Sequence, residues 1–103
     1  MALHISSEAT DDARIVHVTG EVDVSNAPAL RAALDEALTA GAARIQVDLS
    51  EVPYIDSTGI GVLVGAARRA AESASAIAVV HPQRNVARVL SLLGVVDELG
   101  ANQ

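Results

Sequence analysis

The feature that most constrains this chain is the segment Tyr54–Gly65, which reads YIDSTGIGVLVG. Asp56, Ser57 and Thr58 precede an apolar run, and such residues typically begin a helix because their side chains cap free backbone N–H groups. Glycines then interrupt the predicted helix, and each costs about 1 kcal/mol relative to alanine. We expect a helix with this cost to allow close approach by another backbone, which glycine permits because it lacks a side chain.

The two faces of this predicted helix differ in character. At about 100° per residue, one face gathers apolar side chains and is predicted to meet the core: Ile60, Leu63, Val64, Ala67 and Ala71. The opposite face has Ser57 at its edge and carries Thr58, Gly61, Val62, Gly65 and Arg69. Its glycines have two interpretations. Either they pack against a neighbouring element of the same fold, or they form a flat docking surface for a partner protein, with the valine at its centre and a modifiable serine at its rim.

Hydrophobic periodicity predicts alternating strands and helices along the rest of the chain. Strands are expected at residues 3–8, 14–19, 44–49, 77–80 and 95–99, and helices from Ser25 or Asn26 to Gly41, at 57–72 and at 83–93. The last helix should bury one face, made of Val86, Val89, Leu90 and Leu93. The order β-β-α-β-α-β-α-β indicates a single small α/β domain over residues 1–103, with a mixed sheet of four to five strands and about three helices.

Composition excludes several classes of partner. The chain has a net charge of −6 and seven arginines but no lysine, which argues against nucleic acid, whose phosphates require clustered cations. The same charge disfavours anionic membranes. Its longest apolar run, Ile60–Ala67, is too short to cross a bilayer, and the N-terminus lacks the basic and apolar regions of a signal peptide. The absence of cysteine fits a reducing cytoplasm, and no spacing of His or carboxylates predicts a metal site.

The segment Asp56–Gly61, DSTGIG, together with the strand before it and the helix after it, resembles the signature of STAS domains. It is most similar to that of stand-alone bacterial anti-anti-sigma factors, the anti-sigma factor antagonists. Upstream, Thr19–Asp23 (TGEVD) is similar to the family's second motif, and the resemblance extends over about residues 10–97. The family usually ends in a further helix. Only Gly100–Gln103 remain here, so we expect that helix to be absent or reduced to a turn.

An enzymatic role for Ser57 finds no support in the sequence. A serine nucleophile needs a general base and an oxyanion hole, and the surrounding IDSTG is not the G-x-S-x-G elbow of α/β hydrolases. No glycine-rich run ends in Lys-Ser/Thr, so a phosphate-binding P-loop is absent as well. We therefore predict a binding module rather than an enzyme, with no cofactor of its own.

The resemblance implies a phosphorylation-controlled switch of binding partners. The unphosphorylated domain would bind an anti-sigma factor that is also an ATP-dependent serine kinase, and so free a sigma factor for transcription. The kinase would then phosphorylate Ser57, rather than Thr58, and a metal-dependent serine phosphatase would reset the switch. The alternative is a STAS subunit of another machine, such as a lipid-transport complex or a stress-signalling assembly.

The residues expected to meet the partner come from both motifs and from the glycine-bearing face. They are Asp23, Ser25, Asp56, Ser57, Thr58, Gly61, Val62, Gly65 and Arg69. Asp23 and Asp56 follow strands, at the carboxyl ends where α/β sheets place their sites. Each also has a purely structural interpretation, as a turn residue or a helix cap, and the sequence does not decide between the two.

Overall fold

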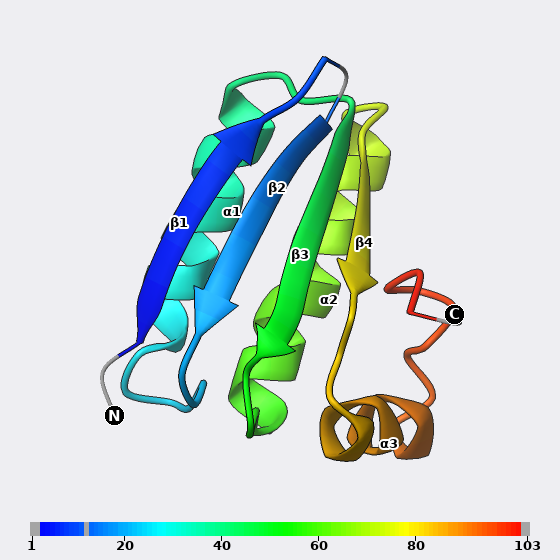
Figure 1. The fold of residues 1–103 in the computed structure, drawn as a ribbon. Coiled ribbons are helices and arrows are strands. Elements are labelled where there is room, and N and C mark those ends of the chain that lie inside the picture. Colours follow the sequence, from blue (N-terminus) through cyan, green and yellow to red (C-terminus); the bar gives the residue numbers. More distant parts are fainter. Residues whose placement is uncertain (1–2, 12, 102–103) are drawn as a thin grey trace.

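The computed structural model describes residues 3–11 and 13–101, which form one mixed sheet and three helices (Figure 1). The strands are β1 (His4–Ala9), β2 (Ala13–Thr19), β3 (Arg44–Glu51) and β4 (Ala76–Val80), and the helices are α1 (Ala27–Thr39), α2 (Ser57–Glu72) and α3 (Arg84–Leu92). The strands lie in the order β1-β2-β3-β4, with β1 antiparallel to β2 and the other pairs parallel. The predicted α/β class and mixed sheet are confirmed.

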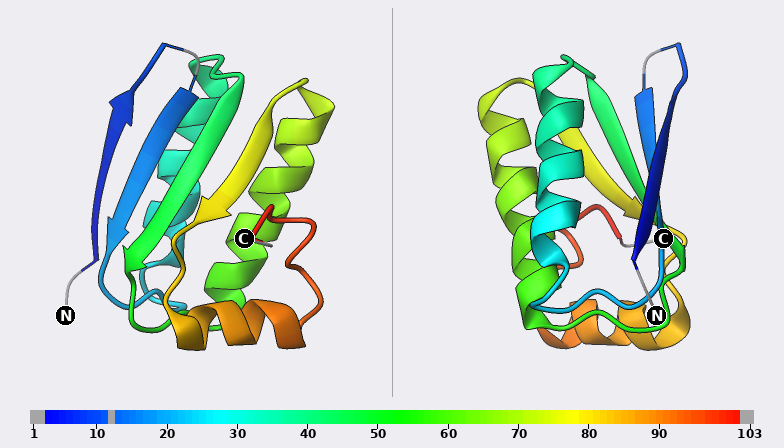
Figure 2. Two further views of the ribbon diagram at one scale, coloured as in Figure 1. Left: turned by 45° about the vertical axis from the view of Figure 1, so that its right-hand side comes forward. Right: turned by 90° about the vertical axis from the view of Figure 1, so that its left-hand side faces the viewer.

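Helices α1 and α2 cover one face of the sheet, whereas α3 lies across its lower end (Figures 1 and 2). The alternation within β3 explains this layering. Ile45, Val47 and Leu49 are buried beneath the helices, and the intervening Gln46 and Asp48 lie on the face that neither α1 nor α2 covers. In the described part of the chain, no helix combines the length and apolar character that a membrane span requires.

The last predicted strand, residues 95–99, does not form. After α3 the chain turns on itself, beginning with Gly94 at a φ of 71° and continuing with a hydrogen bond from the Leu99 N–H to the Val95 carbonyl at 3.0 Å. The segment still reaches the sheet, because the Val79 N–H donates to the Leu99 carbonyl at 2.7 Å. Apolar side chains here fill the end of the core from a turn rather than from a strand.

The core-facing side of α2 is rotated from the predicted one. Ile60 and Leu63 are buried as predicted, but Ala71 is exposed and Val64 and Ala67 are only half-buried. The buried positions that the pattern missed are Gly59, Ala66 and Ala70. These residues are small, so they add little to a hydrophobic pattern even though they allow the helix to lie close to its neighbours.

Helix α3 packs against the core through one apolar face. Val86 and Leu90 are buried as predicted, whereas Val89 is only half-buried. Leu93 was predicted to face the core but is 52% exposed. The helix ends at Leu92, so Leu93 occupies the C-cap position and no longer follows the helical stripe.

Candidate functional site

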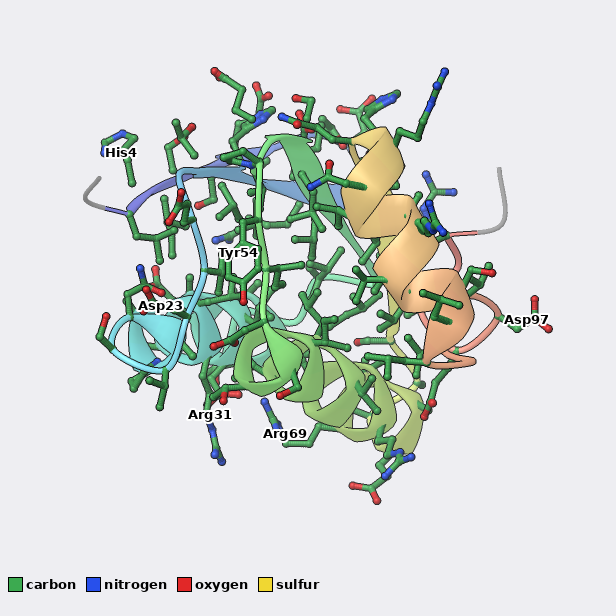
Figure 3. The ribbon with its side chains drawn as sticks, turned by 90° about the horizontal axis from the view of Figure 1, so that it is seen from below. His4, Asp23, Arg31, Tyr54, Arg69 and Asp97 are labelled. Atoms are coloured by element: carbon green, nitrogen blue, oxygen red, sulfur yellow. The ribbon has the colours of Figure 1, made fainter. Side chains whose placement is uncertain are left out.

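The two sequence motifs meet at the lower end of the sheet, where Figure 3 views the molecule end-on. Val22, in the loop after β2, joins segment 52–56 through its backbone. Its N–H donates to the Tyr54 carbonyl at 3.0 Å, and its carbonyl accepts from the Asp56 N–H at 3.1 Å. Asp23 and Asp56 therefore come from two backbone segments that are held side by side.

Asp56 caps helix α2. Its backbone is extended, and its carboxylate accepts a hydrogen bond from the Gly59 N–H at 3.0 Å. This confirms the interpretation of Asp56 as a helix cap. Ser57 becomes the first residue of the helix, and both Ser57 and Thr58 are exposed. The serine is therefore accessible to a modifying enzyme, at the positive end of the helix dipole.

Asp23 organises the loop before α1. Its carboxylate accepts from both the N–H of Ser25 at 2.9 Å and the hydroxyl of Ser25 at 2.5 Å. These hydrogen bonds lower the pKa of Asp23 from its usual value, and the bond from the Ser25 hydroxyl contributes most. They therefore favour the ionised carboxylate. Asp23 is thus a turn residue, and it also presents a negative charge at this end of the molecule.

Asn26 occupies the N-cap position of α1, but its side chain does not cap the helix. It serves the loop instead. Its Oδ1 accepts from the Asp23 N–H at 2.9 Å, and its Nδ2 donates to the Glu21 carbonyl at 2.9 Å. Of the two residues predicted to begin α1, Asn26 thus occupies the N-cap position, but neither side chain caps the helix, because both hold the loop that carries Asp23.

Gly59 lies where the two motifs are packed most tightly. A Cβ atom at this position would lie 2.7 Å from a side-chain carbon of Val22 and 2.7 Å from one of Ile55. Neither is the far end of a flexible side chain, since both are Cγ1 atoms of buried branched residues. The fold itself requires this glycine.

Gly61 and Gly65 are different. A Cβ atom at Gly61 would meet nothing within 4 Å, and one at Gly65 would meet only the Arg69 side chain, whose Nη1 would be 3.4 Å away. The interpretation in which these two glycines pack against another element of the fold is therefore wrong. They leave an open strip along α2 that continues from the exposed Ser57 and Thr58.

Two residues of the predicted docking face are placed differently from expectation. Val62 is half-buried and packs against the core, so it is not the outward centre of the face. Arg69 lies about 18 Å along the helix axis from Ser57, at 1.5 Å per residue. Its Nη2 donates to Asp35 of α1 at 2.7 Å, beside Arg31, as Figure 3 shows.

The structure thus gathers most of the predicted site at one end of the domain. Asp23, Ser25, Asp56, Ser57 and Thr58 lie on the two joined motifs, and Gly61 follows one turn along α2. Within the described residues no group of three His, Cys, Asp or Glu side chains could hold a metal ion.

Sequence reasoning missed two apolar residues at this end. Val24 is 69% exposed and Tyr54 is 50% exposed, and they flank the joined motifs (Figure 3 labels the tyrosine). Exposed aromatic side chains are common anchors of protein interfaces. The available signal was that Tyr54 is the only aromatic residue of the chain and stands two residues before the DSTGIG motif.

A second set of interacting titratable groups lies elsewhere, on the sheet face that α1 and α2 leave uncovered. His17 contacts Glu8 through Nε2 at 2.8 Å and Asp48 through Nδ1 at 3.1 Å. The bond with Glu8, followed by that with Asp48, raises the pKa of His17 despite partial desolvation. Burial alone would raise the pKa of Asp48, but hydrogen bonds from Ser50 and His17 outweigh it and lower that pKa.

Comparison with known proteins agrees with this fold. Residues 5–100 match the family model described as "Mlab, STAS domain". An anti-sigma-B factor antagonist of Listeria monocytogenes is 31% identical over 97 residues, which are 94% of this chain and 84% of the relative. Among solved structures, a putative anti-sigma factor antagonist of Thermotoga maritima has a TM-score of 0.83 at 32% identity, over 90% of this chain and 80% of that one. One from Mycobacterium paratuberculosis has a TM-score of 0.85 at 25% identity, over 93% and 81%.

Proposed function

Since this chain belongs to the STAS domain family, we propose that it is an anti-sigma factor antagonist whose binding is switched by phosphorylation of Ser57. In its unphosphorylated form it binds an anti-sigma factor that is also a serine kinase, and so frees a sigma factor for transcription. A serine phosphatase reverses the modification. The chain itself acts by binding, and ATP belongs to the kinase.

The observation that carries this proposal is the exposed serine at the start of α2, beside a strip of the helix that the fold does not use. Ser57 is the first helical residue, and a Cβ atom at Gly61 or Gly65 would contact no other element of the fold, only the Arg69 side chain of α2 itself. A partner backbone can approach such a strip closely. A group attached to the serine would then stand at the edge of the contact.

Phosphorylation suits this position because it changes the surface without breaking the fold. A phosphate adds about −1.5 to −2 charges at pH 7. The helix N-terminus stabilises negative charge through its free N–H groups and its dipole. The partner, in contrast, would meet a bulky anion beside the carboxylates of Asp23 and Asp56, at the edge of the contact. We expect the complex to separate while the domain stays folded.

Incubation with the cognate kinase and ATP should add one phosphoryl group, and mass spectrometry should locate it on Ser57. Ser57→Ala should bind the kinase without release, and Ser57→Asp should bind at least tenfold more weakly in calorimetric titration. Thr58→Ala is the matched control, because it removes a neighbouring hydroxyl that is also exposed, and it should leave modification of Ser57 intact. Phosphate on Thr58, or equal affinity of the alanine and aspartate variants at Ser57, contradicts the switch.

The alternative role, as a STAS subunit of a lipid-transport or stress-signalling assembly, would use the same surface for a permanent contact. Affinity purification of the wild-type protein under conditions that preserve phosphorylation distinguishes the two. Recovery of a kinase that is lost after phosphorylation supports the switch. Recovery of an assembly whose binding does not depend on Ser57 favours the alternative.

A further inference from the structure

We propose that the partner surface continues from Ser57 across the outer side of helix α3, and that α3 receives an acidic patch of the partner with an apolar residue beside it. This inference rests on the proposed function, since the partner is the same anti-sigma factor kinase. It extends the contact to a helix that neither sequence motif includes.

Exposed apolar side chains are gathered at this end of the molecule. Within the described residues, the large hydrophobic side chains that are most exposed are Val24 at 69%, Tyr54 at 50%, Leu92 at 76% and Leu93 at 52%. The first two flank the joined motifs, and the last two end α3. Figure 1 places the loop before α1, the start of α2 and the whole of α3 at the lower end. The joined motifs and the end of α3 therefore both present exposed apolar side chains at this end of the molecule (Figure 1).

The outer side of α3 combines this apolar end with positive charge. Arg84, Arg88 and Leu92 follow one another at intervals of four residues, and all three are exposed. At about 100° per residue they lie opposite Val86 and Leu90, which are buried. The stripe therefore faces away from the sheet, at the end of the molecule where Ser57 lies.

These two arginines have no partner within the described residues. The ion pairs of the fold engage Arg31, Arg68 and Arg69, but neither Arg84 nor Arg88. Like charges one turn apart on a helix destabilise it by a few tenths of a kcal/mol. The fold thus carries a small cost here, in a chain whose net charge is −6. A partner carboxylate would relieve that repulsion.

Helix α3 is also joined directly to the segment that precedes Ser57. The Gln83 side chain donates to the Ser50 carbonyl at 3.0 Å, and the Asn85 side chain donates to the Pro53 carbonyl at 2.6 Å. Pro53 is the neighbour of Tyr54. A partner that covers the tyrosine therefore meets a surface on which α3 is already held in place, so little ordering is needed on binding.

The charge pattern identifies the partner as an acidic protein surface. Nucleic acid is disfavoured, because two arginines on a chain of net charge −6 give few phosphate contacts. A membrane is disfavoured because the apolar face of α3, with Val86 and Leu90, is buried in the fold and is not free to enter lipid. Carboxylates opposite Arg84 and Arg88, next to an apolar contact with Leu92, fit the stripe.

The test is calorimetric titration of the purified kinase with full-length variants. Arg88→Glu and Leu92→Glu should each weaken binding at least tenfold, and the loss for Arg88→Glu should shrink as salt rises. Arg44→Glu is the matched control, because Arg44 is also exposed and lacks an ion pair among the described residues but begins β3 at the other end of the sheet. Its affinity should equal that of the wild type. Thermal unfolding should show all three variants folded.

The outcomes separate this inference from the proposal it rests on. If the wild type and the α3 variants bind the kinase equally, and Ser57→Asp does not bind, the switch stands and the role of α3 is overturned. If the wild type itself does not bind, both are overturned. Binding of the wild type, but not of Leu92→Glu, to vesicles of anionic phospholipid would instead assign the stripe to a membrane and overturn the inference.

Discussion

The first turns of α2 carry glycine on both their inward and their outward side, but the two glycines have different roles. Gly59 faces inward, and a single added carbon would lie 2.7 Å from both Val22 and Ile55. Gly61, two residues later, faces outward and has nothing within 4 Å of where its Cβ would be. The first glycine allows two motifs of the fold to join. The second has no such role, although it weakens the helix by about 1 kcal/mol relative to alanine.

This difference indicates where the functional surface lies. It is the side of α2 on which a glycine lowers the stability of the helix without serving the packing of the fold. Gly59 is explained by packing alone. Gly61 and the exposed Ser57 need an external reason, and a partner that approaches α2 closely supplies one. Two results would contradict this distinction. One is that position 59 tolerates a side chain, and the other is that position 61 affects only the stability of the fold.

The largest expected effect is on the inward side. Gly59→Ala should destabilise the protein by about 2 kcal/mol, because overpacking of a tight core typically costs about 1–3 kcal/mol and exceeds the gain in helix propensity. Urea unfolding monitored by circular dichroism measures the change. A Gly59→Ala variant as stable as the wild type would show that Val22 and Ile55 can move aside, and the contrast between the two sides would disappear.

A smaller effect is expected at the helix start. Asp56→Ala removes the carboxylate that accepts from the Gly59 N–H, and loss of such a cap typically costs about 1 kcal/mol. Asp56→Asn is the matched control, because asparagine caps helices about as well without the charge. Stability should fall in the alanine variant and recover in the asparagine variant. Equal loss in both would mean that the charge, and not the cap, stabilises this end.

The smallest effect concerns pH, and it arises away from α2. The raised pKa of His17 stabilises the fold below about pH 6.5, and this stabilisation is lost as pH rises through the folded-state pKa. The lowered pKa of Asp48 stabilises it above about pH 3.9, and this is lost as pH falls through its folded-state value. Stability should therefore be greatest between about pH 4 and about pH 6.5.

Unfolding free energies measured from pH 5.5 to pH 8.5 test this assignment. The wild type should lose stability toward alkaline pH, and His17→Gln should not. His4→Gln is the matched control, since His4 is an exposed histidine on the neighbouring strand β1. If the decline persists in His17→Gln, the pH dependence comes from another region.

Much of the fold follows from local patterns in the sequence. The alternation of β3 and the apolar stripe of α1, which buries Leu30, Leu34 and Ala37, are strong signals. The observed bounds Arg44–Glu51 and Ala27–Thr39 agree closely with the prediction. The strand predicted at residues 95–99 was wrong because the apolar residues there fill the core from a turn. Hydrophobic periodicity cannot distinguish such a turn from a short strand. The core side of α2 was misplaced because its contact residues are alanine and glycine.

The site was predicted only in part, for a reason that the glycines illustrate. In the sequence, helical periodicity places Gly61 and Gly65 on the face opposite the core, but it does not show that Gly59 is tightly packed or that the other two are open. Only the tertiary contact of Val22 with the start of α2 distinguishes the first from the others. Val24 and Tyr54 were missed for the same reason, because the exposure of an apolar side chain in a loop depends on what packs beside it.

The most direct test of the account is the affinity of Gly61 variants for the kinase, measured beside their stability. Gly61→Ala and Gly61→Gln should both be as stable as the wild type or more so, by up to about 1 kcal/mol, since the position is open and both residues form helices better than glycine. Unphosphorylated Gly61→Gln should nevertheless bind the kinase at least tenfold more weakly than the unphosphorylated wild type. Its side chain fills the space that a backbone segment of the kinase would occupy. Unchanged affinity of a stable Gly61→Gln variant would contradict the claim that this side of α2 is the partner surface.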